Sequence, residues 1–262
     1  MDDEEIHKKK LEAIEARIEQ LDKEIGYVVE EPFDMGYRDK TGKVVIYTDP
    51  WRNTFFFYEG LAHVEDYNCK HGFIDKTGIE VIPCQFDAAR DFSEGLAAVM
   101  NSNKKWGYID KTGEMVISYQ WEDPGFFKKG LARVRGSNGQ YGFIDKTGTV
   151  IIPCLWNGAD NPDTDLIRVR NTSGKWGLID KTGREVILCR WDDISPYFED
   201  GLIKVKSATG LWGYIDINGR VIIPCQFDEA YDFHNGLAQV VYNGKYCYID
   251  TMGKIVGNGL KP

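Results

Sequence analysis

The pattern of apolar and polar residues changes near residue 25. Before that point, apolar side chains recur at alternating steps of three and four residues: Leu11, Ile14, Ile18, Leu21 and Ile25. Such a series forms a heptad seam, so we predict an amphipathic helix over residues 3–25, in a segment spanning residues 1–25. A helix of about two heptads is marginally stable alone. The seam therefore either caps the first repeat described below or forms a homo-oligomer.

After residue 25, short apolar runs alternate with turn residues in a repeating order. The string Ile-Asp-Lys-Thr-Gly occurs at residues 74–78, 109–113, 144–148 and 179–183. In the second copy, residues 108–110 predict a short strand, Asp-Lys-Thr-Gly predicts a turn, and residues 114–117 predict the returning strand of a hairpin. A stretch of irregular residues follows, and an alternating strand at 130–134 completes a unit of three strands.

Three markers keep one register along the chain. An aromatic-Gly pair or its remnant precedes each Ile-Asp or its variant, an aromatic residue recurs after each hairpin, and Gly-Leu-Ala-x-Val or a variant follows. The signature glycines are Gly36, Gly72, Gly107, Gly142, Gly177 and Gly213, with Cys247 in the seventh position. These markers define about seven units over residues 26–256 and leave residues 257–262 as a C-terminal tail. One unit cannot bury its apolar face alone, so neighbouring units must stack.

We therefore predict an all-β repeat array of about seven three-stranded antiparallel units with an N-terminal α-helix. The alternative is a closed, seven-bladed, propeller-like ring. Propeller blades usually have four strands in about 40–45 residues, whereas these units offer three strands in about 35. Degenerate first and last units are typical of the caps of an open array, which favours the open form.

The same residues resemble a known family. Residues 106–113 read Trp-Gly-Tyr-Ile-Asp-Lys-Thr-Gly, residues 81–83 read Val-Ile-Pro, and residues 92–97 read Phe-Ser-Glu-Gly-Leu-Ala. They resemble WG repeats, also called KWG repeats, over nearly everything after residue 25. The resemblance implies an all-β array in a bacterial protein that serves as an interaction scaffold. The copies depart from the pattern at Cys247, and in the fourth unit at Asp165 and Pro162, which replace Gly and Phe.

Charge and composition exclude several classes of protein. The 262 residues carry a net charge of −9, which argues against nucleic-acid binding, because that needs a basic surface. No apolar run approaches the roughly 18 residues of a membrane-spanning helix, so we expect no membrane insertion. The acidic start lacks the apolar stretch of a signal peptide. We therefore expect a cytoplasmic protein with reduced cysteines.

No motif in the sequence indicates catalysis, a cofactor or a metal. Residues 145–151 match the phosphorylation pattern of P-type ATPases, in which an aspartate accepts phosphate. Here the first four of these residues recur in other units as a hairpin turn, whereas a catalytic site is normally one convergent group. The cysteines and histidines also lack metal-ligand spacing. We therefore predict a protein that is not an enzyme, with no cofactor and no metal.

Two loops depart most from the repeat, and insertions in repeat proteins often lie on a binding face. One contains Asp160, Asp163 and Asp165, and the other, which has one extra residue, contains Asp193 and Ile194. We predict that these five residues contact a protein partner, whose identity the sequence does not give.

The predicted function is a non-enzymatic protein-interaction scaffold. The alternative is a ligand- or glycan-binding module, because exposed aromatic side chains on repeats can stack on sugars. The exposure of Trp106, Trp176 and Trp212 separates the two, since a lectin needs accessible rings.

Overall fold

The computed structural model describes residues 3–25, 36–38, 44–47 and 49–258. The chain forms two compact units. The first comprises Met1–Ser137 and Ile144–Thr149, and the second comprises Asn138–Phe143 and Val150–Pro262.

The described residues form one helix, α1 (Asp3–Ile25), and seven small antiparallel sheets. Sheet by sheet, the strands are β1 (Gly36–Arg38) and β2 (Val44–Tyr47); β3 (Asn53–Tyr58), β4 (Leu61–Glu65), β5 (His71–Asp75) and β6 (Glu80–Phe86); β7 (Ala88–Ala89), β8 (Ala97–Met100), β9 (Trp106–Ile109) and β10 (Met115–Trp121); β11 (Asp123–Pro124), β12 (Leu131–Arg135), β13 (Tyr141–Asp145) and β14 (Val150–Trp156); β15 (Gly158–Ala159), β16 (Leu166–Arg170), β17 (Trp176–Asp180) and β18 (Glu185–Trp191); β19 (Asp193–Ile194), β20 (Ile203–Lys206), β21 (Trp212–Ile215) and β22 (Val221–Phe227); and β23 (Glu229–Ala230), β24 (Leu237–Tyr242), β25 (Lys245–Asp250) and β26 (Ile255–Asn258).

The all-β array with one N-terminal helix is confirmed, but the predicted count of three strands per unit is wrong. Six of the described sheets have four strands. In five of them the additional strand is only two residues long, as in β11, which pairs with β12. It lies directly after the aromatic marker, in the stretch predicted to be irregular. A two-residue strand has no alternation that a sequence pattern can reveal.

The fourth strand also changes the comparison with a propeller. A count of three strands favoured the open array over the closed ring, and that argument does not hold for four-stranded sheets. The degenerate end units still favour the open array, which stays a prediction. At the C-terminal end, β26 runs to Asn258 and so into the segment predicted as the tail. Residues 26–29, which resemble the Gly-Leu-Ala-x-Val strand and are predicted to form the first strand of this kind, lie outside the described residues.

The Asp-Lys-Thr-Gly turns join the last two strands of a sheet as hairpins. Between β9 and β10, Asp110 Oδ1 accepts hydrogen bonds from the backbone N–H and the hydroxyl of Thr112, at 2.9 and 2.6 Å. Gly113 has a φ of +85°, which side chains with a Cβ rarely adopt. In the equivalent turn at Asp145, the Thr147 hydroxyl makes the same bond and lowers the pKa of the carboxyl group. The recurring string therefore has a structural reason.

Consecutive sheets within a unit pack through one recurring contact. An isoleucine on the last strand of one sheet lies over the turn glycine of the next. A Cβ on Gly113 would lie 3.2 Å from the side chain of Ile82, and a Cβ on Gly183 would lie 3.2 Å from that of Ile152. Glycine is thus required at this position both for its backbone conformation and for the close approach of the neighbouring sheet.

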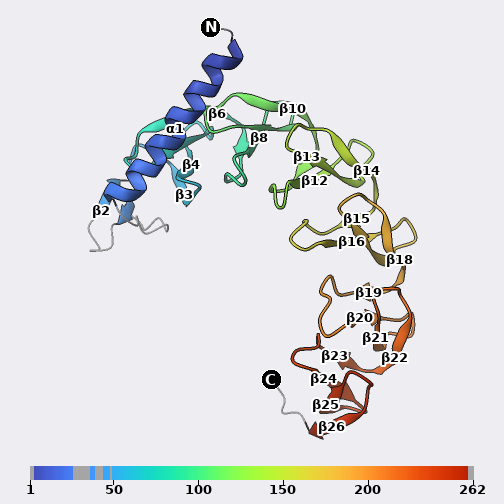
Figure 1. Ribbon diagram of the computed structural model, residues 1–262. Coiled ribbons are helices and arrows are strands. Elements are labelled where there is room, and N and C mark those ends of the chain that lie inside the picture. Colours follow the sequence, from blue (N-terminus) through green and yellow to red (C-terminus); the bar gives the residue numbers. More distant parts are fainter. Residues whose placement is uncertain (1–2, 26–35, 39–43, 48, 259–262) are drawn as a thin grey trace. The chain divides into compact units, whose positions relative to one another are not determined.

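Helix α1 lies across two sheets of the first unit, β3–β6 and β7–β10, as Figure 1 shows. Arg17 Nε donates a hydrogen bond to Asp75 Oδ2 at 3.0 Å. Ten residues earlier along the helix, His7 Nε2 lies 2.6 Å from Asp110 Oδ2. Both aspartates begin Asp-Lys-Thr-Gly turns, so the helix contacts the same turn in successive repeats.

The seam predicted from Leu11 to Ile25 faces the first unit. Ile18 lies over Gly60, in the turn between β3 and β4, and packs against the core of that sheet. Leu21 is 8% exposed, and the earlier seam residues are half-buried. The side chain of Ile25 lies outside the described residues. These contacts are those expected of a cap, and homo-oligomerisation through the same seam stays a prediction.

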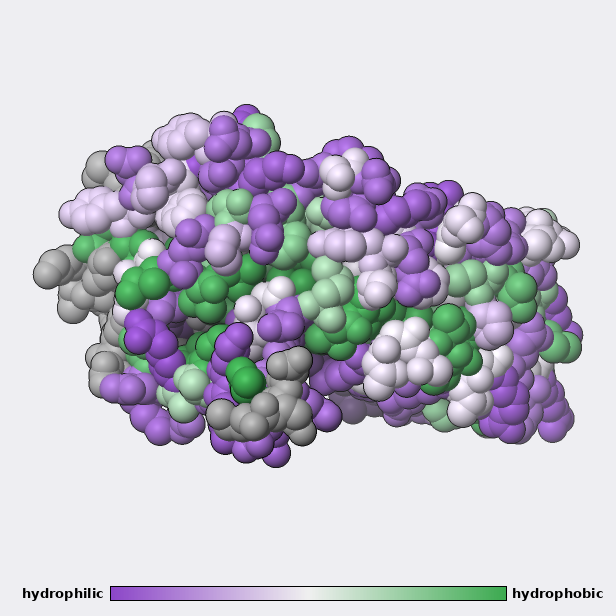
Figure 2. Space-filling model, turned by 90° about the horizontal axis from the view of Figure 1, so that it is seen from above, coloured by the Kyte–Doolittle hydropathy of each residue, from purple (hydrophilic) through white to green (hydrophobic). Residues whose placement is uncertain are grey.

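The last strand of each four-stranded sheet lies at an edge, and three of these strands contain proline: Pro83 in β6, Pro153 in β14 and Pro224 in β22. Proline cannot donate to a ladder and is tolerated at edges, where it also limits pairing with a strand of another chain. Apolar residues still reach the surface, and Figure 2 shows apolar areas within a largely polar face.

None of the six cysteines forms a disulfide. Four of them occupy one repeat position and are half-buried: Cys84, Cys154, Cys189 and Cys225. Cys247 is buried and Cys69 is exposed. Burial raises the pKa of Cys84 to about 12 and that of Cys189 to about 11.

These differences predict an order of thiol labelling. Because the thiolate is the reactive form, a raised pKa keeps Cys84 and Cys189 protonated at pH 8. We expect a maleimide to modify Cys69 first and these two at least about tenfold more slowly, as read by peptide mass spectrometry over time. Denaturation without reductant should then expose six reactive thiols. Two or more disulfides in freshly purified protein would contradict this expectation.

Candidate partner-binding site

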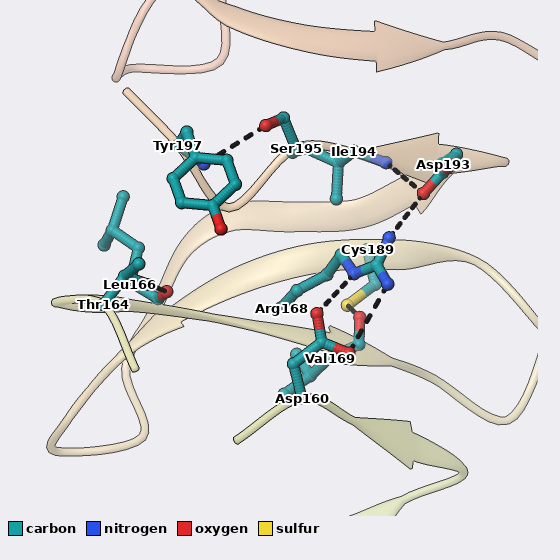
Figure 3. A network of polar contacts seen from close by, with 10 residues as sticks. All are labelled: Asp160, Thr164, Leu166, Arg168, Val169, Cys189, Asp193, Ile194, Ser195 and Tyr197. Atoms are coloured by element: carbon teal, nitrogen blue, oxygen red, sulfur yellow. Dashed lines mark hydrogen bonds and ion pairs between the residues drawn. The ribbon is translucent and has the colours of Figure 1, made fainter. Parts of the chain in front are cut away.

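Arg168 joins the two loops that depart most from the repeat, as Figure 3 shows. It lies on β16, and its Nε donates a hydrogen bond to Asp160 Oδ2 at 2.8 Å. Its Nη1 donates to Asp193 Oδ1, also at 2.8 Å. Asp160 follows β15 and Asp193 lies on β19, in the next sheet. A planar guanidinium suits two carboxylates at once, so one side chain fixes the spacing of the two loops.

A hollow of about 200 Å³ opens beside this network, within the second unit. The residues that give it its chemistry are Arg168, Asp193, Tyr197, Lys204, Trp212 and Asp232. Lys204 Nζ lies 3.6 Å from Asp232 Oδ2, so the hollow carries both signs of charge. Tyr197 is 54% exposed. An accessible aromatic ring among paired charges is typical of a protein interface.

The second loop is buried just before Tyr197 and exposed at Tyr197 itself. Ile194 ends the short strand β19 and is 1% exposed, which anchors the chain in the core. Ser195 is also buried, and its Oγ accepts a hydrogen bond from the backbone N–H of Tyr197 at 3.2 Å. Pro196 lies between them and restricts the backbone. The loop therefore turns outward immediately after the buried residues Ile194 and Ser195.

The signature tryptophans are half-buried, and cations lie close to their rings. Arg168 lies 4.4 Å from the ring centroid of Trp176, and Arg90 lies 5.3 Å from that of Trp106. The Nζ atoms of Lys204 and Lys206 each lie 5.3 Å from the ring centroid of Trp212. Stacking on a sugar needs an open ring face, and these rings already make cation–π contacts.

The structure separates the five predicted contact residues into three groups. Asp160 and Asp193 come together through Arg168. Asp163 and Asp165 are exposed on their loop, where Asp165 Oδ1 lies 3.3 Å from Lys181 Nζ. Ile194 is buried in the core of its sheet and also lines the hollow beside Arg168, so its contact with a partner stays a prediction. A two-residue strand places alternate side chains inside and outside, and Ile194 is the one inside.

The sequence reading missed Arg168, Lys204 and Tyr197. Arg168 and Lys204 both occupy the variable position of the Gly-Leu-Ala-x-Val strand. Their side chains contact acids of the following repeat, Asp193 and Asp232. A basic residue at the variable position, followed by an acid in the next loop, was the signal available in the sequence.

The chemistry of this hollow suits binding by contact and charge. Among the described residues, no three His, Cys, Asp or Glu side chains are grouped to hold a metal ion. Within the same part of the chain, α1 is too polar to span a membrane.

A second hollow, of about 290 Å³, lies in the first unit beside Asp87 and Tyr119. Lys70 and Lys104 both donate to Asp87, at 2.5 and 3.1 Å. The hydrogen bond from Lys70 is the largest cause of the lowered pKa of Asp87. Because this hollow lies within regular repeats, we take the hollow beside Arg168 as the candidate site.

Small antiparallel sheets, each built from a copy of one sequence, define an all-β repeat protein. The chain belongs to the family of WG-containing repeat proteins. The family model described as "WG containing repeat" matches residues 72–104, 106–139, 141–176, 176–207 and 212–246. The resemblance read from the sequence is therefore confirmed.

Two solved structures show a weak likeness to the chain. The computationally designed Ika8 protein has a TM-score of 0.41 at 11% identity, over 85% of this chain and 80% of that one. BamB from Moraxella catarrhalis has a TM-score of 0.40 at 14% identity, over 76% of this chain and 70% of that one. Likenesses at this level carry no argument about function. None of the curated proteins compared with the chain matches it.

Proposed function

We propose that this WG-repeat protein is a non-enzymatic, cytoplasmic scaffold that binds a protein partner at the hollow beside Arg168. The observation that carries the proposal is the exposed ring of Tyr197, which lies beside a guanidinium that bridges two loops. Tyr, Trp and Arg are the side chains enriched in binding hot spots. Because Arg168 is held by two carboxylates, it loses little conformational freedom when a partner binds.

Charge supports a protein partner over a nucleic acid, because the chain has a net charge of −9 and a polyanion would be repelled. The cations beside Trp176 and Trp212 support a protein partner over a glycan. A sugar would have to displace a charged side chain from each ring before it could stack.

A crosslinking experiment tests the site. Tyr197 is replaced in the full chain by a photo-crosslinking phenylalanine analogue, and the protein is irradiated in the cells that produce it. The matched control carries the analogue at Tyr67, which is 70% exposed in the first unit. We expect one protein to crosslink through position 197 and not through position 67.

The purified partner then provides the decisive measurement. We expect Tyr197→Ala to weaken its binding at least about tenfold, as for a hot-spot residue, and Tyr67→Ala to leave it unchanged. Equal affinity for wild type and Tyr197→Ala would overturn the proposal. Capture of a carbohydrate at this position, with tryptophan fluorescence quenched on binding, would favour the glycan-binding alternative.

A further inference from the structure

Consecutive sheets share a second contact, which is aromatic. The ring of Tyr108 on β9 meets the ring of Phe127 edge to face, with centroids 5.0 Å apart, and the Tyr108 hydroxyl donates to the carbonyl of Gly125 at 2.8 Å. Phe127 and Gly125 belong to the following repeat. The Tyr108 side chain is almost completely buried, with 1% of its surface exposed.

The same arrangement recurs in both units. Tyr214 meets Phe233 at 4.8 Å, and its hydroxyl donates to the carbonyl of Tyr231 at 2.7 Å. Phe73, which has no hydroxyl, meets Phe92 at 4.9 Å. Where the earlier repeat supplies a tyrosine, the following repeat covers it with a phenylalanine ring and with the backbone carbonyl two residues before that phenylalanine. We call these two groups the cover of the tyrosine. Edge-to-face rings are a favourable geometry for such pairs.

The last described sheet lacks this cover. Tyr248 pairs with Gln239 just as Tyr214 pairs with Lys204, so Tyr248 occupies the same repeat position. It is nevertheless 38% exposed, and no hydrogen bond to its hydroxyl lies within residues 49–258. Leu237 is 43% exposed, whereas the leucines that open the equivalent strand in four other sheets, at positions 61, 96, 131 and 202, are 1–8% exposed.

A third residue, Gly257, indicates that the missing cover is shorter than a whole repeat. Gly257 pairs with Tyr248, where the other sheets have the isoleucine that covers the turn glycine of the next repeat. A Cβ on Gly257 would meet nothing within 4 Å. A complete further repeat bound here would therefore lack the isoleucine that covers its turn glycine. The surface formed by Leu237, Tyr248 and Gly257, which we call the terminal face, therefore suits a short segment better than a folded repeat.

We propose that the terminal face binds a short segment of a partner protein that carries a phenylalanine two residues after a free backbone carbonyl. In the bound state the phenylalanine ring meets Tyr248 edge to face, and the carbonyl accepts the Tyr248 hydroxyl. The template for this segment is Tyr231-Asp232-Phe233, which covers Tyr214 in the preceding sheet. This surface is separate from the hollow beside Arg168 and does not depend on it.

A peptide with the sequence of residues 226–236 tests the proposal, because it contains the template. Its fluorescently labelled form is titrated with the full chain, and anisotropy is measured. We expect saturable binding. Replacing Phe233 of the peptide by alanine, with Phe227 kept, should weaken binding at least about tenfold, since the Phe233 ring supplies most of the buried apolar area. In the protein, Tyr248→Phe should weaken it about threefold to tenfold through the lost hydrogen bond, and Tyr248→Ala should abolish it.

Two matched variants make the result specific. Tyr67→Ala and Tyr197→Ala, each at an exposed tyrosine elsewhere, should bind the peptide as wild type does. Circular dichroism should show the same fold for all variants, because each replaced tyrosine lies at the surface of its sheet or turn. A lack of saturable binding up to about 1 mM would overturn the proposal. So would equal binding by wild type and Tyr248→Ala, which would mean that the peptide enters an internal junction. Self-association lost on Tyr248→Ala would assign the face to a second copy and also overturn it.

Discussion

Replacement of Gly177 by valine should lower the free energy of unfolding by about 3 kcal/mol, at the upper end for an overpacked core. Gly177 is a signature glycine on β17. A Cβ at this position would lie 2.4 Å from the carbonyl oxygen of Ile187 and 2.8 Å from the backbone nitrogen of Cys189. Both are backbone atoms of the neighbouring strand β18. No side-chain rotation can relieve such a clash, so β18 has to move away from β17.

Chemical denaturation followed by tryptophan fluorescence measures this effect. The matched control is Gly257→Val in β26, where a Cβ meets nothing within 4 Å. We expect the control to change the free energy of unfolding by no more than about 0.5 kcal/mol, as for a typical surface substitution. A Gly177→Val protein that unfolded at the wild-type denaturant concentration would show that the signature glycine is not required by packing.

The clash gives the repeat signature a physical meaning. The aromatic-Gly pair was visible in the sequence as a marker, but periodicity alone did not say why glycine is needed. The structure supplies the reason, which is the close approach of the backbone of the edge strand after its repeated isoleucine (Ile187 in the case of Gly177), seen again at Gly72 and Gly142. In the last sheet the isoleucine is replaced by Gly257 and cysteine replaces the signature glycine, as Cys247, which pairs with Asn258.

Features fixed by local chemistry could be predicted from the sequence. The hairpin at Asp110 depends on residues within one turn, and the helix seam depends on spacing along one segment. The two-residue strands such as β11 could not be predicted, because they are defined by their partner strand and not by their own residues. The array was therefore predicted correctly, with one strand too few in each repeat.

The candidate site depends on contacts between repeats, which the sequence shows only indirectly. Asp160 and Asp193 were found because their loops depart from the repeat, but the residue that joins them, Arg168, follows the repeat pattern and was missed. Ile194 is the second residue of the short strand β19 and is almost fully buried, although it also lines the hollow. Departures from the repeat thus located the loops, while burial decides which side chains can meet a partner.

The two proposed binding surfaces arise from the repeat in different ways. The hollow beside Arg168 lies at the loop in which one repeat has an extra residue, and Tyr197 of this loop is exposed. The terminal face arises because the cover that each repeat receives from the next is missing at Tyr248. A scaffold with both could hold two partners, one through a folded surface and one through a short segment.

Replacement of Ile18 by aspartate should detach α1 from the first unit and lower the free energy of unfolding by about 2 kcal/mol, since it places an unpaired charge in an apolar contact. Ile18 packs against the core of sheet β3–β6. The matched control is Ala16→Asp, which makes the same change of charge at an exposed position on the same helix and loses at least as much helix propensity. We expect the control to unfold close to wild type.

Two further measurements on these variants decide how the seam is used. If α1 is a cap, limited proteolysis should cleave within residues 3–25 at least about tenfold faster in Ile18→Asp than in Ala16→Asp, because release of the helix raises the population of the open form. The molar mass from light scattering should then be the same for wild type and both variants. A dimeric wild type that became monomeric in Ile18→Asp would instead show that the seam from Leu11 to Ile25 joins two copies. The contacts of Arg17 with Asp75 and of His7 with Asp110 hold α1 to its own chain, so we expect the cap.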